Sequence, residues 1–336
     1  MPWFEETSPR LWRFPERFRP VLPPGLFEAG KQTAGVRIRL RTDSPSLSMR
    51  ATFPPFTPHP NMTQFSVQGI STYVDGKFWS SRVPPLEGGE VDLSLFATTT
   101  TEMRDICIYL PPYGTVEVES LDVHDESSFE RPRPFSVDLP IVFYGTSITQ
   151  GGCVSRPGLS YQARLSRTLN IDYVNMGFSG MGRCEESVAK IVSQIEASCY
   201  VIDVGQNNTP GELAQRLPPF IDMIRARRPR TPMLVTTPIF YAAELWSSSY
   251  RAEAREKRMI IESIVRERQR AGDDMIHLLS YENYMGPDVT DGSVDGAHPN
   301  DVGFERMARG LEEPLSRILG LTRAGSHRPV RSGNSP

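Results

Sequence analysis

The stretch Ile141-Val-Phe-Tyr-Gly-Thr-Ser-Ile-Thr-Gln-Gly151 decides the fold of the larger part of this chain. Its first four residues form an unbroken apolar run, which is typical of a strand buried on both faces. The small and hydroxylated residues that follow indicate a turn at the end of this strand. Similar apolar runs recur downstream and alternate with helical periodicity. The pattern therefore predicts an α/β domain with a parallel sheet between two layers of helices.

The remaining elements of this domain follow from the same reading. Four further strands are predicted at 171–175, 200–204, 233–237 and 275–279. Helices are predicted at 160–169, 185–197, 210–227, 250–271 and 299–319, where apolar residues recur with a period near 3.6.

The part of the chain up to and including residue 140 has a different pattern. It holds eighteen of the 30 prolines and no long helical period. Short alternating runs predict strands with one buried face at 35–41, 47–53, 69–74, 91–95, 106–110 and 116–121. Asp75-Gly76 predicts a hairpin turn. We therefore expect a β-sandwich over 1–135, an α/β domain over 136–322 and a disordered tail over 323–336.

Composition excludes several classes of protein. Hydrophobic residues make up 38% of the 336 and charged residues 23%, which is ordinary for a folded chain. With a net charge of −3 and no polybasic block, no nucleic-acid partner is expected. No apolar run is long enough to span a membrane and no signal peptide is recognised, so a cytoplasmic location is expected.

The four cysteines and five histidines show no metal-ligand spacing. We expect Cys107 and Cys199 to be buried free thiols, whereas the sequence leaves open whether Cys153 and Cys184 pair. No metal and no cofactor are expected.

Candidate reactive residues follow the predicted strands, where open parallel sheets bind their ligands. Ser147 comes directly after the first strand, but a serine hydroxyl needs a base to become nucleophilic. His298, before the last helix, can be that base, and Asp295 can accept its ring N–H and fix the tautomer. Taken alone, Ser147 would be interpreted as a turn or N-cap residue, and the Asp-x-x-His motif as having a structural role. Together, at the two ends of one sheet, they indicate a catalytic triad.

Two further residues fit the stabilisation of a negative charge on an oxygen atom. Gly180 follows the second strand and can offer an unobstructed backbone N–H, and Asn207 follows the third and can offer its side-chain amide. The structural alternatives are a turn glycine and a turn cap.

Four segments resemble, in order and spacing, the four blocks of the SGNH (GDSL-type) esterase/lipase superfamily. They are Gly-Thr-Ser-Ile (145–148), Asn-x-Gly-x-Ser-Gly (175–180), Gly-Gln-Asn (205–207) and Asp-Gly-Ala-His-Pro-Asn (295–300). The resemblance implies a flavodoxin-like three-layer α/β/α fold. It makes Ser147 the nucleophile, His298 the base and Asp295 the orienting acid. It also implies an oxyanion hole formed by Gly180, Asn207 and the backbone N–H of Ser147.

The N-terminal part is similar to the GxDLY-type β-domain that precedes some of these enzymes, although Ser71 and Thr72 replace the Asp-Leu of that name. The catalytic blocks depart from the family pattern at two positions, Thr146 in place of aspartate and Asn208 in place of the usual block-three aspartate. Neither position supplies a triad group. The loss of two carboxylates makes the expected rim less anionic, which would favour acidic substrates.

The resemblance implies a serine esterase with a small-molecule or carbohydrate ester as substrate, such as an acylated sugar or glycoside. An acyltransferase of specialised metabolism would use the same triad, and a non-catalytic carbohydrate-binding protein with a vestigial site is the alternative from another class. Tyr241, Trp246 and Tyr250 are candidates for lining the substrate pocket, with ordinary packing as the other reading.

Overall fold

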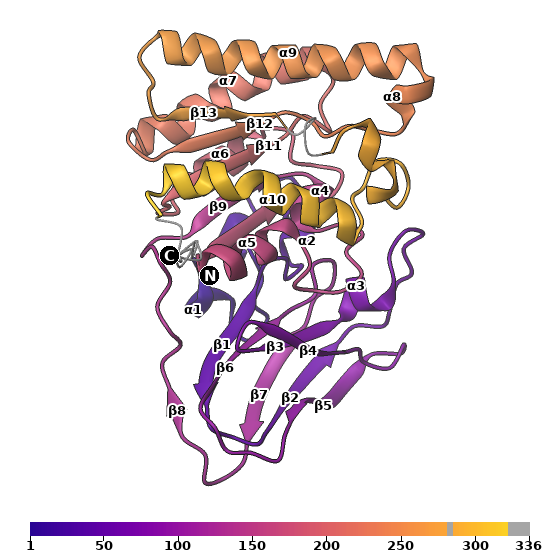
Figure 1. The fold of residues 1–336 in the computed structure, drawn as a ribbon, viewed down its shortest axis with the longest axis vertical. Helices are drawn as coiled ribbons and strands as arrows, with labels where there is room; N and C mark the ends of the chain where they lie inside the picture. Colours follow the sequence, from indigo (N-terminus) through magenta and orange to yellow (C-terminus); the bar gives the residue numbers. More distant parts are fainter. Residues whose placement is uncertain (281–284, 322–336) are drawn as a thin grey trace, which may run out of the picture.

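The structure is a computed structural model that describes residues 1–280 and 285–321. An α/β layer structure and a β-sandwich stand end to end in it (Figure 1). The tail predicted to be disordered, 323–336, lies outside the described residues.

Five parallel strands form the sheet of the α/β domain, in the order β10-β9-β11-β12-β13. Their bounds are β9 Ile141–Gly145, β10 Tyr173–Gly177, β11 Cys199–Asp203, β12 Met233–Thr236 and β13 Ile276–Leu279. Every residue of the first four is buried, as their largely apolar sequences predict. The strand order is that of a flavodoxin-like fold, because the chain leaves β9 first to one side and then to the other. Ligands bind outside the carboxyl ends of the strands at such a switch point.

Helices cover both faces of this sheet, which confirms the three-layer architecture. One face carries α6 Glu186–Val192, α7 Pro210–Arg227 and α9 Ser248–Arg270, and the other carries α5 Tyr161–Leu169 and α10 Asp301–Ile318. Short helices α4 Ser147–Gln150, α8 Ala243–Trp246 and η2 Pro287–Gly292 occupy the connections. Among the described residues, no helix is both long and apolar enough to cross a membrane.

Two antiparallel sheets form the sandwich, in the orders β4-β3-β6-β1-β8 and β5-β2-β7. Their strands are β1 Arg37–Thr42, β2 Ser46–Phe53, β3 Ile70–Val74, β4 Lys77–Arg82, β5 Gly89–Ala97, β6 Arg104–Tyr109, β7 Glu117–Val123 and β8 Phe129–Glu130. Alternate side chains from both sheets meet in one apolar core that includes Met49, Leu95 and Ile108. The predicted turn at Asp75-Gly76 joins β3 to β4, with positive φ at both residues.

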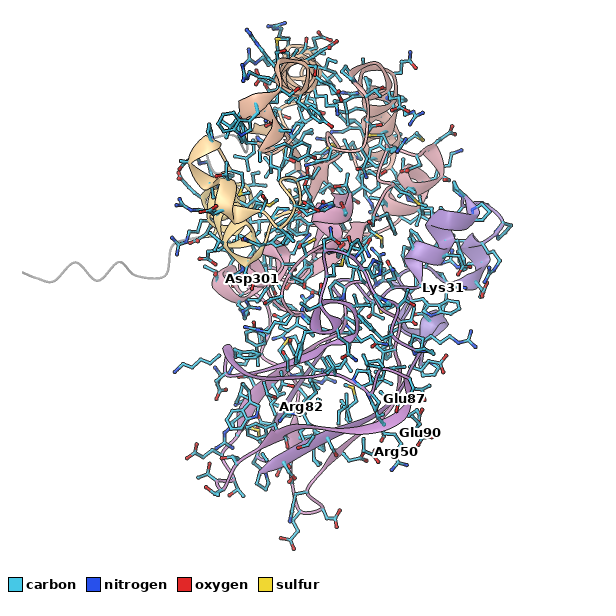
Figure 2. The ribbon with its side chains drawn as sticks, turned by 90° about the vertical axis from the view of Figure 1, so that its right-hand side faces the viewer. Lys31, Arg50, Arg82, Glu87, Glu90 and Asp301 are labelled. Carbon is cyan, nitrogen blue, oxygen red and sulfur yellow. The ribbon has the colours of Figure 1, made fainter. Side chains whose placement is uncertain are left out.

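The first 30 residues form no strand. They contain α1 Phe4–Thr7, η1 Glu16–Phe18 and α2 Pro24–Gly30. Their buried aromatic side chains, among them Trp3, Phe14 and Phe27, join the core on the α6–α7–α9 side of the α/β sheet. Figure 2 shows these helices beside the α/β domain, next to Lys31, whereas Arg50, Arg82 and Glu90 mark the strands of the sandwich. The sequence patterns did not predict this packing.

All four cysteines are free thiols, so Cys153 and Cys184 do not pair. Cys199 is fully buried in β11 as expected, but Cys107 in β6 is only partly buried.

Candidate active site

Ser147 lies at the switch point of the sheet. It is the first residue of α4, separated from the end of β9 only by Thr146, and only 7% of its surface is exposed. Gly145 makes this abrupt turn possible, since a Cβ there would lie 2.2 Å from Thr149 Oγ1 and 2.5 Å from the carbonyl oxygen of Asp203. The close packing of the turn therefore fixes where the hydroxyl of Ser147 lies.

The structure brings the three predicted triad residues into one hydrogen-bonded chain. Ser147 Oγ lies 2.9 Å from His298 Nε2, and His298 Nδ1 lies 2.8 Å from Asp295 Oδ2. With its ring N–H donated to Asp295, the imidazole presents an unprotonated nitrogen to the serine hydroxyl. This is the arrangement that a general base needs to take the serine proton.

A tight turn from 295 to 298 holds the carboxylate of Asp295. Its Oδ1 accepts the backbone N–H groups of Ala297 at 3.1 Å and His298 at 2.8 Å, and Gly296 has a φ of +85° between them. Burial by itself would raise the pKa of Asp295. Hydrogen bonds from the backbone and ring of His298 and from Asn61 outweigh it and lower that pKa well below its ordinary value. The carboxylate therefore stays ionised at neutral pH.

The predicted oxyanion residues lie on two loops that meet beside the nucleophile. Gly180 has a φ of +70° and no heavy atom near the position of a Cβ. Asn207 follows β11, and its amide Nδ2 donates to the carbonyl oxygen of Met181, the residue after Gly180. Gly182 rests against the turn before Ser147, since a Cβ there would lie 2.1 Å from the carbonyl oxygen of Gly145.

A buried arginine from the N-terminal segment supports this loop. Arg13 donates to the carbonyl oxygens of Gly177 at the end of β10 at 2.5 Å, Ala29 at 2.7 Å and Gln32 at 2.9 Å. Its guanidinium also lies 4.5 Å from the ring centroid of Phe178. Burial lowers the pKa of Arg13 to about 9. Arg13 thus fixes the strand end from which the loop with Gly180 begins.

Both departures from the family pattern are buried. Thr146 is fully buried, and Asn208 is 1% exposed and donates to the carbonyl oxygen of Val204 at 2.8 Å. Because both side chains are buried, neither can contact a substrate. The expectation that they make the rim of the site less anionic is therefore not supported.

The structure brings two of the three candidate aromatic residues together. Tyr241 and Tyr250 line a pocket of about 280 Å³ with Gly205 and Gln206, the residues just before Asn207. Tyr241 is packed against the α/β core, and burial raises its pKa far above the ordinary value. Trp246 is 88% exposed and does not line this pocket.

Sequence reasoning missed a carboxylate below the nucleophile. Asp203 ends β11 fully enclosed and accepts hydrogen bonds from Gln206 Nε2 at 2.9 Å and Thr149 Oγ1 at 3.3 Å. Burial raises the pKa of Asp203 to about 6. An acidic residue at the end of an apolar strand was the available signal.

Two other neighbours of the triad carry no sequence signal. Asn61 of the sandwich donates from Nδ2 to Asp295 Oδ2 at 2.9 Å. Cys153 lies so close that its sulfur and one ligand atom each of Asp295 and His298 are within 4.8 Å of one another. Within the described part of the chain, these three residues are the group that could hold a metal ion.

Two family models match the chain. The model of the GDSL-like Lipase/Acylhydrolase family matches residues 138–316, and the model described as the N-terminus of an SGNH-hydrolase-type esterase, GxDLY, matches residues 2–129. A search of curated proteins found no match.

Solved structures share the whole architecture. A GDSL-like lipase candidate from Bacteroides ovatus is 28% identical, with a TM-score of 0.85 over 92% of each chain. A salicylyl-acyltransferase from a tetracycline biosynthetic pathway is 21% identical, with a TM-score of 0.79 over 92% of this chain and 90% of that one. A family two carbohydrate esterase from Clostridium thermocellum is 15% identical, with a TM-score of 0.67 over 85% of this chain and 93% of that one. At 21% and 15% identity, the last two similarities show a shared fold only.

Proposed function

We propose that this chain, which belongs to the GDSL-like Lipase/Acylhydrolase family, is a serine esterase that cleaves carboxylic esters through an acyl-enzyme on Ser147. The observation that carries the proposal is the unbroken hydrogen-bonded chain from Ser147 through His298 to Asp295. It lies at the carboxyl edge of the sheet, where a ligand can reach it.

The geometry supports the following sequence of steps. Ser147 Oγ attacks the ester carbonyl carbon while its proton passes to His298 Nε2. The C–O bond to the alcohol then breaks, and His298 gives the proton to the departing alcohol oxygen. Water attacks the acyl group and passes a proton to His298, which returns it to Ser147 as the carboxylic acid leaves. Asp295 stays ionised and stabilises the imidazolium in both halves.

Negative charge develops on the carbonyl oxygen in each half of this reaction. The backbone N–H groups of Ser147 and Gly180 and the amide of Asn207 are the donors that we assign to it. One amide hydrogen of Asn207 is held by Met181, which leaves the second hydrogen for the oxyanion. Donors that are fixed before the reaction need no reorganisation when the charge appears.

For the substrate we propose an acyl ester of a carbohydrate or glycoside. The pocket beside Asn207 supports this class, since it combines the aromatic side chains of Tyr241 and Tyr250 with the polar groups of Glu253 and Lys257. One solved structure with the same fold is described as a carbohydrate esterase, which agrees with this substrate class.

The test is a panel of acetylated sugars and short p-nitrophenyl esters with the purified protein, alongside Ser147→Ala and His298→Ala. Each variant should fold as the wild type does and lose at least about a thousandfold in kcat. A variant that kept wild-type turnover would refute the assignment. An added alcohol acceptor separates hydrolysis from acyl transfer, because both reactions share the acyl-enzyme and differ only in what attacks it.

A further inference from the structure

We propose that Asn61, a residue of the β-sandwich, is a positioning residue for the triad carboxylate, so that the N-terminal domain completes the active site. The inference rests on the proposed function of Ser147, His298 and Asp295. It assigns to the sandwich a part in the chemical step that is separate from any binding of substrate.

The hydrogen bonds of Asp295 carry this inference. An ionised carboxylate has about four acceptor positions, and all four are filled here. Oδ1 accepts two backbone N–H groups, while Oδ2 accepts the ring N–H of His298 at 2.8 Å and the amide of Asn61 at 2.9 Å. Among the described residues, Asn61 is the one donor to Asp295 from outside the turn 295–298. The hydrogen bond from Asn61 therefore restrains the carboxylate group of Asp295 from rotating away from the ring of His298.

The loop that presents Asn61 is held on both sides. A β-bridge between His59 and Met62 turns the chain so that Asn61 lies at its tip. After the tip, Thr63 begins α3 (Gln64–Gln68) as its N-cap and donates to the carbonyl oxygen of Ser155 in the α/β domain at 3.4 Å. The loop that carries Asn61 is thus held in place by contacts other than the hydrogen bond to Asp295.

The start of the loop is also anchored near the nucleophile. The ring of His59 packs edge-on against Tyr113 at a centroid distance of 6.0 Å. The hydroxyl of Tyr113 in turn donates to the backbone carbonyl oxygen of Ser147 at 3.3 Å. One loop of the sandwich therefore contacts the surroundings of both the nucleophile and the acid.

The hydrogen bond from Asn61 also helps to lower the pKa of Asp295, an effect that a purely structural contact would not have. The amide N–H of Asn61 withdraws electron density from Asp295 Oδ2, the same oxygen that holds the ring of His298. Among the residues that the structure describes, Cys153 and Tyr241 are the further titratable groups on which the charge of Asp295 acts. Burial raises the pKa of Cys153 to about 12 and that of Tyr241 further, so both stay neutral where an esterase works. Without Asn61, the carboxylate is more basic and stabilises the protonated imidazole more strongly.

The experiment compares Asn61→Ala and the isosteric Asn61→Asp with Met62→Ala, a neighbour in the same loop whose thioether side chain cannot donate a hydrogen bond to Asp295. The side chains of Asp295 and His298 are 34% and 29% exposed, so water can replace part of the lost hydrogen bond. We therefore expect Asn61→Ala to lower kcat by about three- to tenfold with KM within about twofold. The acidic limb of kcat/KM should move to higher pH, and Asn61→Asp should lose more, since it places a second carboxylate beside the first.

The controls separate this inference from the proposed function. An active wild type with an unchanged kcat and acidic limb in Asn61→Ala overturns the positioning role alone. Equal losses in Asn61→Ala and Met62→Ala overturn it as well, because they assign the effect to the loop. A wild type that neither hydrolyses the ester panel nor reacts with a fluorophosphonate overturns the proposed function, and the positioning role with it.

Discussion

At the scale of single residues, the site depends on how its hydrogen-bonding atoms are shared. Asn207 gives one amide hydrogen to Met181 and so holds the loops after β10 and β11 together. That same bond orients the second amide hydrogen, the one that we propose as a donor to the oxyanion. Asp203, in contrast, is a buried carboxyl group whose hydrogen bonds come from the neutral side chains of Gln206 and Thr149. It has no cationic partner among the described residues. Each residue gives a prediction of its own.

Asn207→Ala removes the side chain that we propose as a donor to the oxyanion. Because such a donor acts mainly in the transition state, kcat should fall by about 10²–10³-fold while KM changes little. Steady-state kinetics on a p-nitrophenyl ester measure both constants, and a urea unfolding curve checks that the variant is folded. A kcat within fivefold of wild type would remove Asn207 from the oxyanion hole.

Asp203→Asn changes how stability depends on pH. Burial raises the pKa of Asp203 to about 6 in the folded state, against about 3.9 for an unfolded aspartate. Between these values the folded state holds more protons, so the free energy of unfolding decreases as the pH rises from about 4 through 6. The variant cannot titrate. Relative to wild type it should become more stable by up to about 3 kcal/mol between pH 4 and pH 8. Urea unfolding at both pH values tests this, and an equal difference at both contradicts it.

At the scale of elements, most strands and helices could be predicted from periodicity. The buried strands of the α/β sheet are largely apolar runs, and α7 (Pro210–Arg227) has the bounds that the pattern predicts. The strand β4 (Lys77–Arg82) was missed because its residues are mostly exposed and do not alternate. The order of the four motifs indicated the triad, since its residues lie within or beside them. Asn61 and Arg13 could not be found this way, because their roles exist only through contacts distant in sequence.

Arg13 links two elements, the N-terminal segment and the end of β10. Arg13→Met should lower the free energy of unfolding by about 2–4 kcal/mol, because several carbonyl oxygens lose a charged donor in a buried place. Arg13→Lys should recover little, since an ammonium group cannot reproduce the planar fork of donors. Because the loop with Gly180 begins at this strand end, kcat should fall in both variants. Urea unfolding and ester kinetics test the two effects, and an Arg13→Met protein as stable as wild type would contradict this role.

At the scale of the whole molecule, residues of the two predicted domains pack into shared apolar cores. Trp3, Phe14 and Phe27 belong to the core on one side of the α/β sheet, and Tyr73 and Tyr109 of the sandwich belong to the core on the other. Figure 1 shows the sandwich standing directly against the α/β layers. This contact gives the loop with Asn61 a fixed place beside the triad, which composition and periodicity could not reveal.

The nucleophilic role of Ser147 is tested most directly by a fluorophosphonate reaction followed by mass spectrometry of the intact and digested protein. Such a reagent reacts with a serine only when a neighbouring base activates its hydroxyl. We expect one adduct per chain, located on Ser147, and none in Ser147→Ala or His298→Ala. An unreactive wild type, or an adduct on another residue that persists in Ser147→Ala, would contradict this role.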